Sequence, residues 1–155
     1  LMIRRPPRST LDRSSAASDV YKRQFDDISV MAGTLWGEAR NQGDEGMIAV
    51  GNVIMNRVKA KSWYGDHIKG VCLKAWQFSC WNENDPNREK ILALDWSDNA
   101  FCKAVTLSYY FTKNKMDDNT NGATHYHTKT ISPNWAEGKT PCAEIGDHLF
   151  YNDIE

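Results

Sequence analysis

Residues 45–58 read EGMIAVGNVIMNRV, and their apolar side chains fall on most sides of the helix that they predict. A helix that is apolar on most sides lies inside a core, so we expect it to be the central helix of the domain. The polar residues 41–44, NQGD, form a turn before it, with Asp44 as the N-cap of a helix over about residues 45–60. Gly51 indicates that another backbone approaches this helix closely.

Two more helices are predicted on either side of this segment. Four apolar residues recur at i, i+3, i+4 and i+7, namely Ile28, Met31, Ala32 and Leu35. They predict a helix that ends near residues 38–40. A further helix is expected over about residues 98–113, and residues 62–88 are interpreted as a structured loop with short helical pieces.

The last part of the chain is β-prone. Residues 117–122, DDNTNG, predict a turn-rich connection. Residues 124–128 then alternate as a strand does, and residues 145–151 form a second candidate strand that can pair with them. The predicted fold class is mainly α with a small β-element (α+β), in a single domain over residues 25–155.

Residues 1–24 differ from the rest of the 155-residue chain. They combine Arg, Pro and Ser without an apolar period, so we expect a disordered leader. The string resembles translated sequencing-adapter read-through, and it is excluded from the fold prediction on that interpretation. It holds six Lys or Arg and two Asp, which leaves the remaining chain acidic.

Composition excludes several classes of protein. An acidic domain is a poor match for nucleic acid, because neutralising phosphates requires a basic face. No run reaches the ~20 apolar residues of a membrane span. The four cysteines (Cys72, Cys80, Cys102 and Cys142) lack the CxxC spacing of a zinc or redox site, and they allow two disulfides or four free thiols.

Glu38 is a candidate acid catalyst at the end of the first predicted helix. A carboxyl beside Leu35 and Trp36 can be desolvated, which raises its pKa and keeps it protonated near neutral pH. The alternative is a solvated Glu38 paired with Arg40 or Arg57. The residues alone leave both interpretations open.

Two polar segments offer candidate binding or metal-ligating groups. Gln77, Ser79 and Trp81 bring an amide, a hydroxyl and an indole together, which suits sugars but also suits a buried turn. In the predicted strand, Thr124 and Tyr126 share one face and two histidines share the other. His125 and His127 predict a zinc site only if His148 or Asp147 supplies a third ligand.

Four motifs occur in a characteristic order. They are residues 36–40 (WGEAR), 45–58, 77–81 (QFSCW) and 122–127 (GATHYH), the last followed by 132–135 (SPNW). From about Ile28 to Tyr151 the chain resembles the SleB/CwlJ-type cell wall hydrolases, the spore cortex-lytic enzyme family, which also has phage members. The resemblance implies a lysozyme-like fold and activity on the glycan strands of peptidoglycan.

The resemblance also implies roles for individual residues. Family members of the SleB kind are lytic transglycosylases, and their catalytic Glu falls on Glu38. The family commonly has a second Glu where this chain has Gln42. A lytic transglycosylase needs one carboxyl, because the C6 hydroxyl of N-acetylmuramic acid attacks its own C1 and leaves a 1,6-anhydro end. The predicted substrate-binding residues are Gln77, Ser79, Trp81, Thr124, Tyr126, His127 and Trp135.

The full prediction is a monomeric cell-wall enzyme that uses no metal or cofactor and spans no membrane. Three alternatives stay open. A hydrolytic muramidase would take its second carboxylate from Glu45, Asp44 or Asp147. A zinc amidase or peptidase would use His125, His127 and His148, and a non-catalytic module would bind the wall without cleaving it.

Overall fold

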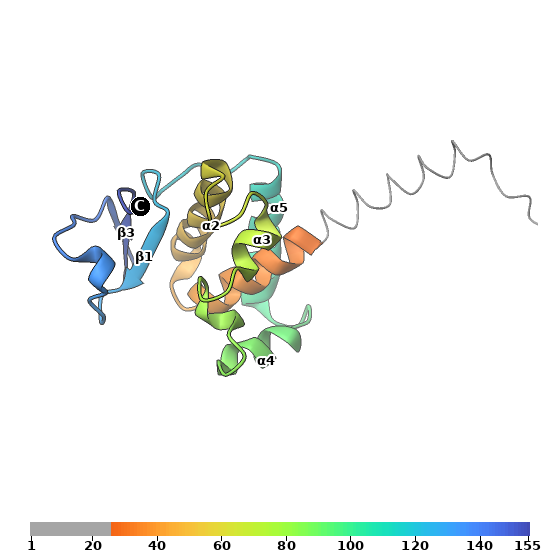
Figure 1. The fold of residues 1–155 in the computed structure, drawn as a ribbon. Coiled ribbons are helices and arrows are strands. Elements are labelled where there is room, and N and C mark those ends of the chain that lie inside the picture. The colour runs from red at the N-terminus through yellow and green to blue at the C-terminus, as the bar shows by residue number, and fades with distance from the viewer. Residues whose placement is uncertain (1–25) are drawn as a thin grey trace, which may run out of the picture.

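Helix α2 (Gly43–Ala60) lies between a helical layer and a small sheet in the computed structural model of the protein, which describes residues 26–155 (Figure 1). The helical layer contains the helix of residues 26–39, here called the Glu38 helix, together with α3, α4 and α5. The predictions for residues 1–24 concern a segment outside the described residues.

Helix α2 is buried on two faces, which explains its apolar sequence. Val50 and Ile54 are fully buried in the larger core, which α2 shares with the other helices. Ala49 and Val53 are fully buried against Phe150 of the sheet. Burial of apolar side chains stabilises by roughly 25 cal/mol per Å². Because α2 buries side chains on both faces, it stabilises the packing of the helical layer and of the sheet. The prediction of a central helix is confirmed.

Two details of this helix differ from the prediction. The helix starts at Gly43, with Gln42 at the N-cap position, so the assignment of Asp44 as the N-cap is wrong. Asp44 lies in the first turn, where its carboxylate pairs with Lys103 at 2.9 Å. The close neighbour of Gly51 is the ring of Phe111, which a Cβ at residue 51 would meet at 2.2 Å, and not a backbone.

The other helices follow the apolar pattern closely. The Glu38 helix ends at residue 39, as predicted, and Met31, Ala32 and Leu35 are fully buried. Helix α5 (Asn99–Thr112) starts where the Asp98 side chain accepts a hydrogen bond from the backbone of Phe101. The Asp98 cap fixes the start of α5, which agrees with the helix predicted over about residues 98–113.

Residues 62–88 contain short helical pieces, as predicted. They are α3 (Ile68–Leu73), the 3₁₀ turn η1 (Ser79–Trp81) and the start of α4 (Pro86–Leu92). Helix α4 itself was not predicted, although its signal is present. Asp85 accepts a hydrogen bond from the backbone of Asn87, and Pro86 occupies the first helical position.

The sheet has three antiparallel strands in the order β1-β3-β2. Strands β1 (His125–Thr128) and β3 (His148–Tyr151) pair with Tyr126 opposite Phe150, which confirms the predicted pairing. The second predicted strand is wrong in extent, because β2 (Ala143–Ile145) and β3 are separate strands. Gly146, with φ of 57°, begins the two-residue connection between them. The short turn η2 (Asn134–Ala136) lies in the β1–β2 loop.

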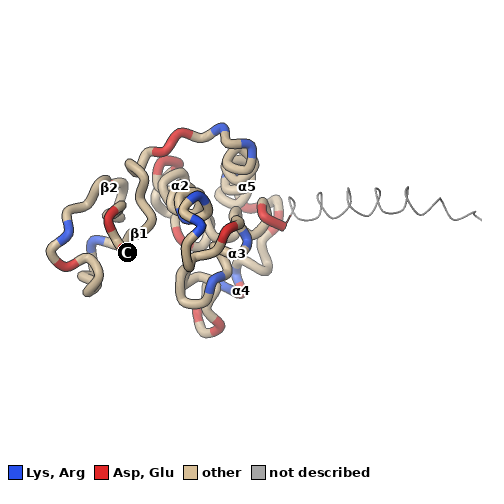
Figure 2. The backbone as a smooth tube through the Cα atoms, turned by 45° about the horizontal axis from the view of Figure 1, so that its top comes forward, with Lys and Arg blue, Asp and Glu red and all other residues tan. Residues whose placement is uncertain are grey.

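The charged residues and the cysteines do not mark out a distinct region of the described fold. Figure 2 shows Lys, Arg, Asp and Glu interspersed along the described backbone. All four cysteines are free thiols, and those of Cys72 and Cys80 are buried. Among residues 26–155, no helix has the length and hydropathy that crossing a bilayer requires.

Candidate active site

The Glu38 carboxyl lies where the end of the Glu38 helix meets the segment before α4. Gly37 makes this contact possible, because a Cβ there would lie 2.7 Å from Cβ of Cys80. With Cys80 so close, its backbone N–H donates a hydrogen bond to Oε1 of Glu38 at 3.4 Å. The Tyr126 hydroxyl of β1 also faces the carboxyl.

Burial raises the pKa of Glu38 above its ordinary value, and the charge of Asp85 acts in the same direction. The Cys80 hydrogen bond and the Tyr126 hydroxyl favour the ionised form and offset only part of this effect. Arg40 does not neutralise the carboxyl, because its guanidinium stacks 4.0 Å from the Trp36 ring centroid and donates to Asn87. The desolvated interpretation of Glu38 therefore fits better than the solvated ion pair.

Arg57 of α2 is a buried cation near this carboxyl, with 4% of its surface exposed. Its Nε donates to the carbonyl of Thr124 at 2.7 Å and one terminal nitrogen donates to Gln77 at 3.4 Å. Its guanidinium also lies 4.9 Å from the ring centroid of Tyr64. Burial lowers the pKa of Arg57, while the negative charge of Glu38 acts in the opposite direction. Arg57 thus orients Gln77 and adds positive potential near Glu38.

An open groove of about 310 Å³ runs past Glu38 between the helical layer and the sheet. Six of the eight predicted site residues line this groove: Glu38, Gln77, Ser79, Tyr126, His127 and Trp135. The first three come from the helical layer and the others from β1 and the loop after it. Residues distant in the sequence therefore meet at one surface.

The other two predicted residues have structural contacts. The Trp81 indole N–H donates to the hydroxyl of Thr34 at 2.9 Å, and its ring packs where Gly33 leaves room. The backbone N–H of Thr124 donates to Tyr151 at 3.0 Å, and its carbonyl accepts from Arg57. Neither residue is part of the groove lining.

The three histidines do not converge. His127 shares one face of the sheet with His125, and its Nε2 is hydrogen-bonded to the Tyr151 hydroxyl at 2.9 Å. His148 lies on the other face, with its ring 4.9 Å from that of Tyr126. In residues 26–155, no three His, Cys, Asp or Glu side chains are grouped as a metal site would need. Burial lowers the pKa of His125 to about 4, so its imidazole is neutral at neutral pH.

The carboxylates proposed for a two-carboxylate mechanism lie away from the groove lining. Asp44 pairs with Lys103, and Glu45 is exposed. Asp147 accepts a hydrogen bond from the Gln42 amide at 3.2 Å and donates its backbone N–H to the same side chain at 2.8 Å. Within the described part of the chain, Glu38 is the one carboxyl that lines the groove.

Several groove residues were not predicted as site residues. Arg57 was considered only as a partner for Glu38, although a polar residue inside an apolar helix was a usable signal. His148 is buried, and its Nδ1 has no hydrogen-bond partner among the described residues. Trp76, beside the QFSCW motif, also lines the groove, and its exposure could not be read from sequence.

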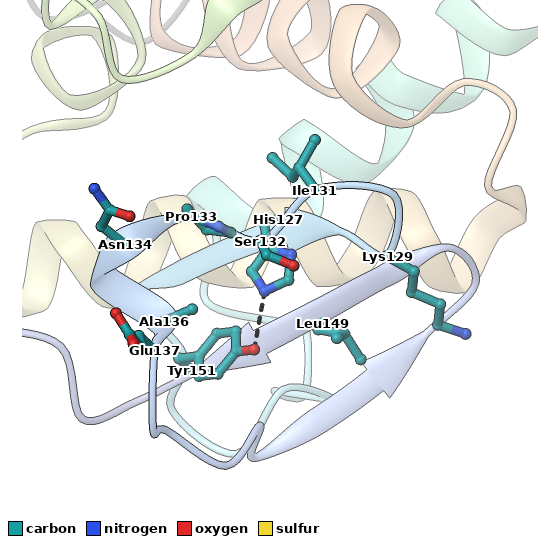
Figure 3. Close-up of a pocket in the computed structure, with 10 residues that line it drawn as sticks. All are labelled: His127, Lys129, Ile131, Ser132, Pro133, Asn134, Ala136, Glu137, Leu149 and Tyr151. Atoms are coloured by element: carbon teal, nitrogen blue, oxygen red, sulfur yellow. Dashed lines mark hydrogen bonds between the residues drawn. The ribbon is translucent and has the colours of Figure 1, made fainter.

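A second hollow of about 470 Å³ lies on the other side of the loop after β1 (Figure 3). The His127–Tyr151 hydrogen bond lies at this hollow, and Lys129 and Glu137 are among its lining residues. It shares His127, Ile131 and Pro133 with the Glu38 groove. The β1–β2 loop therefore forms a wall of both.

Known proteins resemble this chain in sequence and in fold. A family model described as Cell Wall Hydrolase matches residues 41–151. The catalytic domain of the Bacillus cereus SleB protein is 25% identical, with a TM-score of 0.62 over 81% of this chain and 88% of that domain. The catalytic domain of germination-specific lytic transglycosylase SleB from Bacillus anthracis is 27% identical, with a TM-score of 0.63 over 81% and 93%. The fold is thus the lysozyme-like α+β fold of these domains.

A curated protein gives a consistent match. The spore cortex-lytic enzyme of Oceanobacillus iheyensis is 28% identical over 131 residues, which cover 80% of this chain. The match covers 41% of that enzyme, so the chain spans about two fifths of the length of its curated relative.

Proposed function

The chain belongs to the cell wall hydrolase family, and on that premise we propose that residues 25–155 cleave the glycan strands of peptidoglycan as a lytic transglycosylase. The observation that carries this proposal is the environment of Glu38, a desolvated carboxyl and the one carboxyl in the described lining of the groove. The similarity to the germination-specific lytic transglycosylase SleB of Bacillus anthracis supports the same sub-type.

Glu38 acts first as an acid. In its protonated form it donates the proton to the glycosidic oxygen as the bond from C1 of N-acetylmuramic acid breaks. The leaving sugar departs with a free hydroxyl, and positive charge develops at C1. The Cys80 hydrogen bond, the Tyr126 hydroxyl and the nearby charge of Arg57 stabilise the carboxylate that remains.

Glu38 then acts as a base. Its carboxylate takes the proton of the C6 hydroxyl on the same sugar, and the C6 oxygen bonds to C1 to give the 1,6-anhydro ring. No water enters the products, and Glu38 ends protonated as it began. The attack is intramolecular, so proximity supplies what a second carboxylate supplies in a hydrolytic glycosidase.

The remaining groove residues bind and orient the strand. Gln77 is held by Arg57, so its amide is preoriented toward hydroxyl or N-acetyl groups. Ser79 is exposed at the groove and offers a hydroxyl. Trp135 packs on His127 with ring centroids 5.5 Å apart and offers a flat face for a sugar. The mechanism requires neither a metal nor a cofactor.

Product analysis tests this function. Purified sacculi are digested with the wild-type protein, and the muropeptides are separated and weighed by mass spectrometry. We expect anhydro-muropeptides, lighter by one water molecule than hydrolysis products, with or without a strong chelator. Reducing muramic acid ends would instead identify a muramidase. Activity that the chelator abolishes would identify a metalloenzyme, and binding without products would identify a wall-binding module.

A further inference from the structure

Trp76 stands out among the aromatic residues because 82% of its surface is exposed. Tryptophan is usually well buried, so an indole left in water at this level needs an explanation other than core packing. Its backbone is also in the left-handed region, with φ of 68°, which is strained for a residue with a Cβ. The turn around it is closed by the hydrogen bond from Gln77 N to Lys74 O at 3.1 Å.

The position of Trp76 suggests what the exposure serves. Trp76 lines the Glu38 groove and also lines a neighbouring hollow of about 520 Å³. The other residues of that hollow are Ala75, Trp81, Asn82, Glu83 and Asn84. The indole therefore stands where the two hollows meet. Both volumes are within the range of about 300–1,000 Å³ that is usual for small-ligand sites.

The chemistry of this hollow fits a sugar ring. The exposed indole offers a flat apolar face for the C–H groups of the ring. Asn82 and Asn84 offer amides, each with donors and an acceptor, which suit hydroxyl and N-acetyl groups. Glu83 adds an acceptor for hydroxyl groups. The hollow is built of the groups that recognise a neutral, hydroxyl-rich ligand.

We propose that Trp76 is a stacking platform for a further sugar ring of the same glycan strand, bound in the hollow beside the Glu38 groove. This inference rests on the proposed function, because it assumes that a glycan occupies the Glu38 groove. It makes the protein selective for strands long enough to reach both hollows. A disaccharide bound at Glu38 leaves the neighbouring hollow empty, so it gains less from Trp76 than a long strand does.

The test uses Glu38→Gln as the parent, so that the strands are bound without being cleaved. Trp76→Gly, Trp76→Phe and Trp96→Ala are each added to it. Glycine adopts the left-handed backbone without strain, so the first variant keeps the turn. Trp96 is 70% exposed and lines neither hollow, which makes it the matched control. Calorimetry measures the Kd for purified peptide-free glycan strands and for the disaccharide.

We expect Trp76→Gly to weaken binding of long strands by about 3- to 10-fold and to weaken disaccharide binding by a smaller factor. Trp76→Phe should lie between the parent and Trp76→Gly, and Trp96→Ala should match the parent. Equal affinity of Trp76→Gly and the parent for long strands overturns the inference, as does an equal loss for strands and disaccharide. If the parent binds no strand and the wild type cleaves none, the proposed function itself has failed.

Discussion

At the scale of single residues, the central feature of the site is a carboxyl buried at the end of a helix. Gly37 removes the side chain that would keep Cys80 away, and the Cys80 backbone then contacts Glu38. Tyr126 completes the enclosure from the sheet. Ionising a carboxyl buried in this way is unfavourable, so it keeps its proton to a higher pH, as an acid catalyst requires.

The first prediction concerns stability. Because the pKa of Glu38 is raised by folding, the folded state holds this proton more tightly than the unfolded chain. Stability is therefore lost as the pH rises from the ordinary pKa of Glu through the raised one. Glu38→Gln does not titrate, so we expect it to melt at a higher temperature than the wild type at about pH 8, and the gain to shrink at about pH 3. A gain that is equal at both pH values would contradict the raised pKa.

The second prediction concerns Tyr126. Its hydroxyl stabilises the ionised form of Glu38, so Tyr126→Phe should raise the pKa of Glu38 further. We expect the alkaline limb of the pH–rate profile to move to higher pH and kcat to fall about tenfold or more. Tyr110→Phe, at an exposed position of α5, is the control and should change neither quantity. An unchanged profile for Tyr126→Phe would show that its hydroxyl does not act on Glu38.

At the scale of elements, Gln42 connects the two layers. Its amide exchanges two hydrogen bonds with Asp147 in the β2–β3 connection, and a Cβ at Gly146 would lie 2.4 Å from Oε1 of Gln42. The position at which the resembled family commonly has a second Glu is therefore used here as a structural contact. It holds the sheet that carries Tyr126 against the start of α2.

The third prediction follows from this contact. Gln42→Glu keeps an acceptor for the Asp147 backbone but places two carboxylates together. We expect a loss of about 1 kcal/mol at neutral pH, measured by chemical denaturation, and a smaller loss at acid pH. Adding Asp147→Asn supplies a donor and should restore the stability. The products should stay anhydro-muropeptides, and reducing ends from Gln42→Glu would mean that the second carboxylate restores hydrolysis.

Element prediction from sequence succeeded where one physical signal dominates. The apolar period fixes the Glu38 helix, α2 and α5. The prediction of helix boundaries failed where tertiary contacts decide them. Asp44 resembles an N-cap in sequence but pairs with Lys103 of α5. Residues 145–151 split at Gly146-Asp147, a two-residue hairpin turn whose Gly-Asp signal the prediction missed.

At the scale of the whole molecule, the groove joins segments that are distant in the sequence. Family motifs identified Glu38, Gln77 and Tyr126 as partners, and these three residues do meet. The motifs could not tell lining residues from supporting ones. Trp81 lies outside the Glu38 groove, where it donates a hydrogen bond to Thr34 and lines the neighbouring hollow. Arg57 is buried and donates a hydrogen bond to Gln77. Both positions depend on tertiary packing, which the motifs do not contain.

The role of Glu38 as the acid catalyst is tested most directly by the rate at which Glu38→Gln digests purified sacculi, compared with the wild type. The carboxamide preserves the size of the side chain and one acceptor oxygen, but it has no proton to transfer at working pH. We predict that the rate falls by at least about 100-fold while circular dichroism shows the wild-type fold. Digestion at the wild-type rate would show that Glu38 is not the acid.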